Sequence, residues 1–170
     1  MNPMKMLDDM RTIKQLLTDA EAIAREMGEE EPGAEHLLLS AIGLPDGSAG
    51  RVLGSVGIDA DRIRTALRDE QADALVSAGV PRETAEAMAD PTPLGAAGTP
   101  ILYGAGPSGR EVFQEAGKLA RSSKQRLAGA HVVAAIAGLE RGTMPRVLDR
   151  LGVDRQQLAD AARAELAAAR

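Results

Sequence analysis

Ala34-Glu35-His36-Leu37-Leu38-Leu39 is a short apolar run that returns, altered, as Gly129-Ala130-His131-Val132-Val133-Ala134. Two further segments return at the same interval of 95 residues: Arg51-Val52-Leu53 as Arg146-Val147-Leu148, and Gly57-Ile58-Asp59 as Gly152-Val153-Asp154. Constant spacing combined with low identity indicates one supersecondary unit that was duplicated and then diverged. The positions at which the two copies differ are therefore the first places to look for function.

The composition favours a helical protein that binds neither nucleic acid nor membrane. Hydrophobic residues make up 44% of the chain but aromatic residues only 1%, so the core must be built from aliphatic side chains, which suits packed helices. A net charge of −5 argues against a general nucleic-acid binder, and no apolar run reaches the roughly 20 residues of a membrane span. The absence of cysteine excludes disulfides and thiolate metal sites. We expect a cytoplasmic location.

Apolar periodicity predicts helices over residues 2–27, 35–42 and 48–56 of the first copy. A fourth helix should begin after Asp59, because Asp is a good N-cap and the apolar residues on either side of it form a hydrophobic staple. The second copy repeats this cap at Asp154. Between the copies we expect a helix over 81–89 and a Gly/Pro-rich connector over 90–109.

These motifs resemble the amino-terminal domain of the Clp ATPases of the ClpA and ClpC type. Each repeat of that domain carries a Gly-Thr-Glu-His-[Ile/Leu]-Leu-Leu motif and then Leu-x-x-Leu-Gly-[Val/Ile]-[Asp/Ser]. The matching runs here are Gly33–Leu39, Leu53–Asp59, 128–133 and Leu148–Asp154. The resemblance implies an all-α fold of two four-helix repeats related by pseudo-twofold symmetry. Repeat 1 would occupy residues 1–70, an inter-repeat helix and connector 71–100, and repeat 2 101–170, together forming one compact domain.

The same resemblance argues against an enzyme. The sequence ends at Arg170, where a Clp ATPase continues into its AAA+ modules, and it has no Gly-x-x-x-x-Gly-Lys-[Ser/Thr] loop to hold ATP phosphates. We therefore expect a stand-alone, actinobacterial ClpC-like module. Residues 104–109 fit a dinucleotide fingerprint, but neither the strand nor the acidic residue that such a site needs follows them. His36 and His131 have no further metal ligands at suitable spacing, so we interpret them as packing histidines. We expect no catalytic residues, cofactor or metal.

Glu35 is the first candidate binding residue. The resemblance implies a role in binding phosphorylated arginine, because the equivalent ClpC glutamate accepts hydrogen bonds from the guanidinium group. The second copy has Ala130 at this position, which cannot do so. We therefore expect one weakened phosphoarginine site and not two. The alternative is that Glu35 only stabilises the first turn of its helix.

A ligand groove is the second candidate site. The resemblance places Met6 and Tyr103 where actinobacterial ClpC has two phenylalanines that bind cyclic-peptide antibiotics of the cyclomarin class. The groove set is Met6, Leu7, Tyr103, Arg110 and Gln114. An exposed aromatic residue is a common binding anchor. Alternatively, Tyr103 only pins the connector to the domain.

We therefore predict a non-enzymatic module that binds protein or peptide ligands and modulates ClpC-dependent proteolysis. It could act as a decoy that sequesters cyclic-peptide antibiotics from ClpC. Alternatively, it could be an adaptor or phosphoarginine-protein receptor that delivers clients, or a structural partner docked on a Clp oligomer. Its expected partners are the ClpC-type protease machinery or its clients, and peptide or cyclic-peptide ligands.

Overall fold

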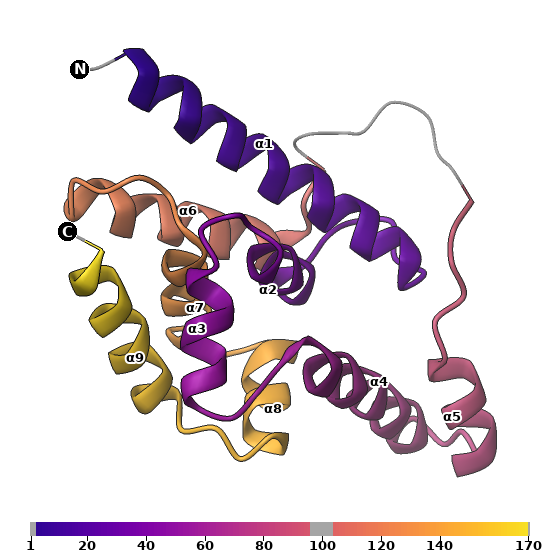
Figure 1. Ribbon diagram of the computed structural model, residues 1–170. Helices are drawn as coiled ribbons and strands as arrows, with labels where there is room; N and C mark the ends of the chain where they lie inside the picture. The colour runs from indigo at the N-terminus through magenta and orange to yellow at the C-terminus, as the bar shows by residue number, and fades with distance from the viewer. Residues whose placement is uncertain (1–2, 96–103, 170) are drawn as a thin grey trace.

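The computed structural model describes residues 3–95 and 104–169, and in this part of the chain it contains nine α-helices and no strand (Figure 1). The helices are α1 (Pro3–Glu26), α2 (Ala34–Ile42), α3 (Ser48–Ser55), α4 (Ala60–Ser77), α5 (Arg82–Ala89), α6 (Pro107–Ser122), α7 (Gly129–Ala137), α8 (Thr143–Arg150) and α9 (Arg155–Ala168). Four helices precede α5 and four follow it, and α2 to α4 begin 95 residues before α7 to α9. The predicted all-α class is confirmed.

The helix boundaries follow the local signals closely. The Asp59 carboxylate accepts a hydrogen bond from the Arg62 N–H at 2.9 Å, and Asp154 accepts from the N–H groups of Gln156 at 2.7 Å and Gln157 at 3.3 Å. These bonds satisfy N–H groups that a helix start leaves without partners. Two boundaries differ from expectation: α4 continues to Ser77, past residue 70, and α6 begins at Pro107, inside the expected connector.

The core is built around α2 and α7, which pack against each other at the centre of the molecule (Figure 1). Almost every side chain on these two helices is buried, and α1 and α6 cover them from outside. The repeats are interleaved, because α3 packs on α7 and α9 of the other repeat while α8 packs on α4. Neither repeat therefore closes its own core.

Two reciprocal ion pairs join the repeats. Arg51 Nη2 of α3 lies 2.6 Å from Glu165 Oε1 of α9, and Arg146 of α8 pairs with Glu70 of α4. Both arginines and both glutamates are equivalent residues of the two copies. A contact in which residue i meets residue j and j meets i is the signature of a twofold interface. The pseudo-twofold relation is thus visible in specific side chains as well as in helix order.

The symmetry breaks at the starts of the two central helices. At α7, Gly129 N–H donates to Asp46 Oδ2 at 2.9 Å and Ala130 N–H donates to Ser48 Oγ at 2.8 Å. The loop before α3 thereby closes the start of α7. The second copy has Arg141 at the position of Asp46, and the start of α2 instead receives Ser108, whose Oγ accepts from Ala34 N–H at 3.2 Å.

The inter-repeat segment is attached to repeat 1. Helix α5 packs on α4, and Arg82 Nη1 lies 2.6 Å from Asp73 Oδ1. Beyond α5, Leu94 N–H donates to the carbonyl of Arg25 at 2.8 Å.

The glycine-rich run that enters α6 packs closely against repeat 1. Gly106 N–H donates to the Pro32 carbonyl at 3.0 Å, and a Cβ on Gly109 would lie only 2.5 Å from that same oxygen. None of the described helices combines the length and apolar character needed to cross a bilayer.

Candidate functional site

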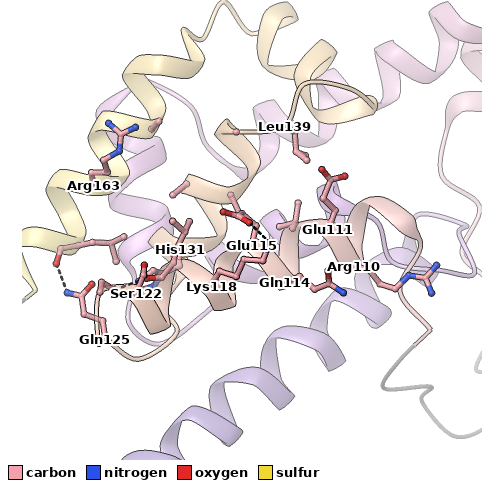
Figure 2. A pocket seen from close by; sticks show the side chains of 18 of the residues that line it. Arg110, Glu111, Gln114, Glu115, Lys118, Ser122, Gln125, His131, Leu139 and Arg163 are labelled. Carbon is pink, nitrogen blue, oxygen red and sulfur yellow. Dashed lines mark hydrogen bonds and ion pairs between the residues drawn. The ribbon is translucent and has the colours of Figure 1, made fainter.

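Each repeat has a cavity at an equivalent place. The repeat 1 cavity, about 420 Å³, lies between the start of α2, the turn after α1, and α4. The repeat 2 cavity, about 940 Å³, lies between α6, α7 and α9 (Figure 2). Five pairs of equivalent residues line both: Met27 and Ser123, Glu29 and Gln125, Arg64 and Ala159, Arg68 and Arg163, Gln71 and Leu166. The two cavities can therefore be compared position by position.

A buried histidine lies beside each cavity and makes the same local hydrogen bond. His36 Nδ1 accepts from Gly33 N–H at 2.9 Å, and His131 Nδ1 accepts from Ala128 N–H at 3.1 Å. Burial, followed by the nearby charge of Arg64, lowers the pKa of His36 to about 4, and burial also lowers the pKa of His131. Both imidazoles are thus neutral near pH 7 and carry their proton on Nε2. This is the behaviour expected of packing histidines.

Two carboxylates converge on His36 in the repeat 1 cavity. Glu35 Oε1 lies 3.6 Å from His36 Nδ1, and Glu29 Oε1 lies 4.0 Å from His36 Nε2. Burial raises the pKa of Glu35, and burial together with the charge of Glu35 raises the pKa of Glu29. Among the described residues, neither carboxylate forms an ion pair with a lysine or arginine. The cavity therefore presents two acidic groups that form no ion pair with its arginines.

A metal ion fits this cluster less well than an N–H donor does. Ligand atoms of Glu29, Glu35 and His36 lie within 4.8 Å of one another. However, the lone pair of His36 Nδ1 is used by Gly33 N–H, and Nε2 carries the proton. The imidazole could ligate a metal only by changing tautomer and breaking that helix-capping bond. Donor groups such as a guanidinium need no such rearrangement.

The repeat 2 cavity lacks these charges. Gln125 and Ala130 occupy the positions of Glu29 and Glu35, and Ala159 occupies that of Arg64. The two turns are equivalent in structure as well as in sequence. The Glu29 N–H donates to the Ala24 carbonyl, and the Gln125 N–H donates to the Ala120 carbonyl. The same scaffold therefore carries two carboxylates beside the histidine in repeat 1, and neutral residues at those two positions in repeat 2.

The predicted cyclic-peptide groove is only partly brought together. Arg110 and Gln114 both line the repeat 2 cavity, at the end of α6 nearest the connector (Figure 2). Met6 lines a separate cavity beneath α1, and Leu7 is exposed. Tyr103 lies outside the described residues. The five residues acting as one groove stay a prediction.

Sequence reasoning found Glu35 but missed Glu29. The run of three glutamates at 29–31 reads as a solvated turn, and half of the Glu29 side chain is indeed exposed. Its carboxylate nevertheless turns back toward His36. The available signal was the 96-residue offset that relates α1 to α6, because extending it through the turn pairs Glu29 with Gln125.

Comparison with known proteins identifies the fold. Residues 11–90 match the family model described as the Clp repeat (R) N-terminal domain. This part of the chain is a Clp N-terminal repeat domain. The structure of the chain is similar to the crystal structure of the N-terminal domain of the caseinolytic protease associated chaperone ClpD from Arabidopsis thaliana. The TM-score is 0.55 at 23% identity, over 92% of this chain and 90% of that one. No curated protein matches the sequence.

The family match covers α5 and most of repeat 1 of this Clp N-terminal domain, and the structural similarity extends to both repeats. The resemblance read from the duplicated motif is therefore confirmed at the level of the fold. The acidic cavity lies inside the matched region. The repeat 2 cavity, which has no acid at the positions of Glu29 and Glu35, lies outside it.

Proposed function

We propose that this Clp N-terminal domain is a non-enzymatic binding module whose repeat 1 cavity recognises a guanidinium group on a protein or peptide ligand. The observation that carries this proposal is the pair of carboxylates, Glu29 and Glu35, which converge on His36 and form no ion pair with a lysine or arginine of the described residues. A planar guanidinium offers several N–H donors in fixed directions and stays charged at all relevant pH values. Binding it would satisfy both acids at once.

A phosphorylated arginine is the form of this group that the cavity suits best. Arg64 and Arg68 line the same cavity as the two glutamates, so positive charge is available for a phosphate next to negative charge for a guanidinium. Repeat 2 keeps Arg163 but has no acid at the positions of Glu29 and Glu35. This difference supports a single phosphoarginine site, located in repeat 1.

The test is binding of an acetylated peptide with a central phosphoarginine, measured by calorimetry beside the same peptide with arginine or lysine. The Glu35→Gln variant should bind phosphoarginine about tenfold to a hundredfold more weakly, since it loses a hydrogen bond to a charged group. Glu29→Gln should act in the same direction. Glu30→Gln is the matched control, because Glu30 is exposed in the same turn. Equal affinity in wild type and Glu35→Gln would refute the proposal.

In the cell, such a module would modulate ClpC-dependent proteolysis in the cytoplasm, as an adaptor that presents marked clients or as a structural partner docked on a Clp oligomer. Recovery of a ClpC subunit with the intact chain from cell extract supports an adaptor. An adaptor would also have to carry a phosphoarginine-marked protein into that complex, whereas a docked structural partner would not.

A decoy for cyclic-peptide antibiotics is the second candidate, and one observation favours it. The first three turns of α1 expose large apolar side chains, namely Met4, Met6, Leu7 and Met10. Exposed apolar residues that lie together commonly mark a binding surface. A cyclomarin-type peptide should then bind tightly, and Met6→Ser and Tyr103→Ala should each weaken it. Absence of binding removes this candidate.

A further inference from the structure

A third cavity of about 810 Å³ lies beneath the start of α1 and adjoins the repeat 2 cavity. Its lining includes Met6 and Asp9 of α1, Gln125 of the turn after α6, His131 of α7 and Leu166 of α9. We call it the α1 cavity.

The α1 cavity collects buried polar atoms that have no hydrogen-bond partner. In the described part of the chain there are four such side-chain atoms, and three of them belong to this cavity: Asp9 Oδ1, Gln125 Oε1 and His131 Nε2. The fourth is His36 Nε2, the repeat 1 equivalent of His131. Leaving a buried polar atom without a partner is costly, so native proteins rarely do it. Three such atoms, in residues of three separate elements that line one space, indicate a place for a polar ligand.

The hydrogen bonds made by the other polar atoms of His131 and Gln125 determine whether each unpaired atom is a donor or an acceptor. His131 Nδ1 already accepts from Ala128 N–H, so Nε2 carries the proton and is a donor. Gln125 Nε2 donates to the Leu166 carbonyl at 2.7 Å, which orients the amide and leaves Oε1 as an acceptor. Asp9 Oδ1 is also an acceptor. The ligand must therefore supply one acceptor and two N–H or O–H donors.

We propose that the α1 cavity binds a primary carboxamide, carried on the Asn or Gln side chain of a peptide. Its carbonyl oxygen would accept from His131 Nε2–H. Its NH₂ group would donate one hydrogen to Gln125 Oε1 and the other to Asp9 Oδ1. The apolar walls formed by Met6 and Leu166 would contact the aliphatic part of the bound side chain and the neighbouring residues of the peptide.

Other common groups match the three atoms less well. An ammonium or guanidinium has donors but no acceptor for the imidazole N–H, and a carboxylate or phosphate has no donor and would face the charge of Asp9. A hydroxyl has only one donor. A water molecule has the right donors and acceptors, but it occupies about 30 Å³, a small part of this cavity.

The two repeats would then select different groups with one scaffold. Next to His36 the turn supplies Glu29, and next to His131 it supplies Gln125. The repeat 2 residue equivalent to Asp9 is Ala105, 96 residues later, which has no carboxylate. The third contact therefore comes from α1 alone. This inference does not rest on the phosphoarginine proposal, because none of its three residues lines the repeat 1 cavity.

The test uses acetyl-Ala-Gln-Ala-N-methylamide and two matched peptides in which the central residue is Glu or Met. Binding to the intact chain is followed by amide and histidine side-chain NMR. The Gln peptide should shift the signals of His131, Gln125 and Asp9. The Glu and Met peptides should bind at least about tenfold more weakly, since each lacks hydrogen bonds that the carboxamide makes.

Variants assign the contacts. His131→Asn keeps an acceptor for Ala128 N–H but removes the Nε2 donor, and Gln125→Met removes the acceptor. Each variant should bind the Gln peptide about tenfold more weakly than the wild-type chain does. Gln157→Met is the matched control on the exposed face of α9 and should change nothing. Glu35→Gln should also leave this affinity unchanged, which separates the inference from the phosphoarginine site.

Two results would overturn the inference. One is equal binding of the Gln, Glu and Met peptides. The other is no binding of any of them to the wild-type chain, with water signals at the three buried atoms, which would mean that the cavity holds water alone. The wild-type comparison decides the matter even if His131→Asn fails to fold.

Discussion

Glu29 and Gln125 occupy equivalent positions in two equivalent turns, yet they give their cavities different chemistry. In repeat 1 the carboxylate lies opposite the Nε2 of a neutral histidine and beside a second buried acid. In repeat 2 a neutral amide takes its place and is held by a bond to the α9 backbone. Because the histidine and its capping bond are the same in both repeats, specificity depends on the residues around it.

Glu35 is either a buried acid of the cavity or a residue that stabilises the start of its helix. The direction in which it changes stability distinguishes these two interpretations. Burial raises the pKa of Glu35 more than its backbone hydrogen bond lowers it, so the folded state favours the protonated acid. The buried charge therefore costs stability above the ordinary pKa. We expect Glu35→Gln to raise the melting temperature at pH 7 by about 2–4 °C. A residue that mainly stabilised the helix start through the dipole would give a decrease.

Differential scanning calorimetry at pH 7 measures this change, with Glu30→Gln as the exposed control. The gain should shrink as the pH falls below the raised pKa and vanish below the ordinary pKa of 4.5, where the wild-type acid is protonated in both states. A lower melting temperature for Glu35→Gln at pH 7 would contradict the cavity interpretation.

His36 gives the fold an opposite dependence on pH. Its pKa is about 4 in the folded state and 6.5 when exposed, so the folded state binds fewer protons between these values. The contribution of the neutral His36 to the free energy of unfolding has its full value above pH 6.5. It falls as the pH drops toward 4, by on the order of 3 kcal/mol. Protonation of Glu35 partly offsets this loss.

His36→Asn isolates the histidine, because Asn keeps an acceptor for Gly33 N–H and does not titrate. Urea unfolding at pH 7, 6, 5 and 4 should show a shallower decline for His36→Asn than for wild type. Parallel declines of the two proteins would assign the acid sensitivity to other groups.

At the scale of the elements, the start of α7 is a tight junction between the repeats. A Cβ at Gly129 would lie 2.8 Å from Ala49 Cβ and 3.0 Å from the backbone atoms Ala41 O and Ala49 N. Backbone atoms cannot move aside as a flexible side chain would. We expect Gly129→Ala to lower the free energy of unfolding by about 1–3 kcal/mol.

Gly54→Ala is the matched control, because Gly54 lies inside α3 with open space around its Cβ position. Alanine there should stabilise the chain by up to about 1 kcal/mol, through its higher helix propensity. Denaturant unfolding of the two variants should give opposite signs. If Gly129→Ala and Gly54→Ala both stabilise the chain, α7 can shift away from α3.

The elements also show which features a sequence reveals. The caps Asp59 and Asp154, the apolar central helices and the constant spacing are local signals, and they predicted the fold and its helices closely. Asp46 was not predicted, because its contact with Gly129 joins segments far apart in the chain. Asp9 was missed for the same reason: its role depends on where α1 passes over the turn after α6. Glu35 was found only because its motif resembles a known one.

At the scale of the whole molecule, two reciprocal ion pairs join the repeats, Arg51–Glu165 and Arg146–Glu70. Within each pair, the positive and negative residues should be exchangeable. The arginine of each pair is 59% exposed, so each pair contributes little alone and is weakened by salt. Arg51→Glu should lower the melting temperature by about 1–3 °C, and adding Glu165→Arg should restore most of the loss.

The same exchange at Arg146 and Glu70 should behave alike, except that Glu70 also contacts Arg150 and so recovery there should be less complete. Thermal unfolding at low and high salt measures both cycles. A double variant no more stable than Arg51→Glu alone would show that the pair does not couple the repeats.

The reciprocal pairs have a consequence for how such a chain can change over time. The ion pairs that join the two halves lie on α3, α4, α8 and α9, whereas the acids that differ between the halves lie beside His36. A substitution of Glu29 or Glu35 therefore leaves these ion pairs intact. A gene that encodes two halves of this kind can keep one inherited specificity while the other half explores a new one.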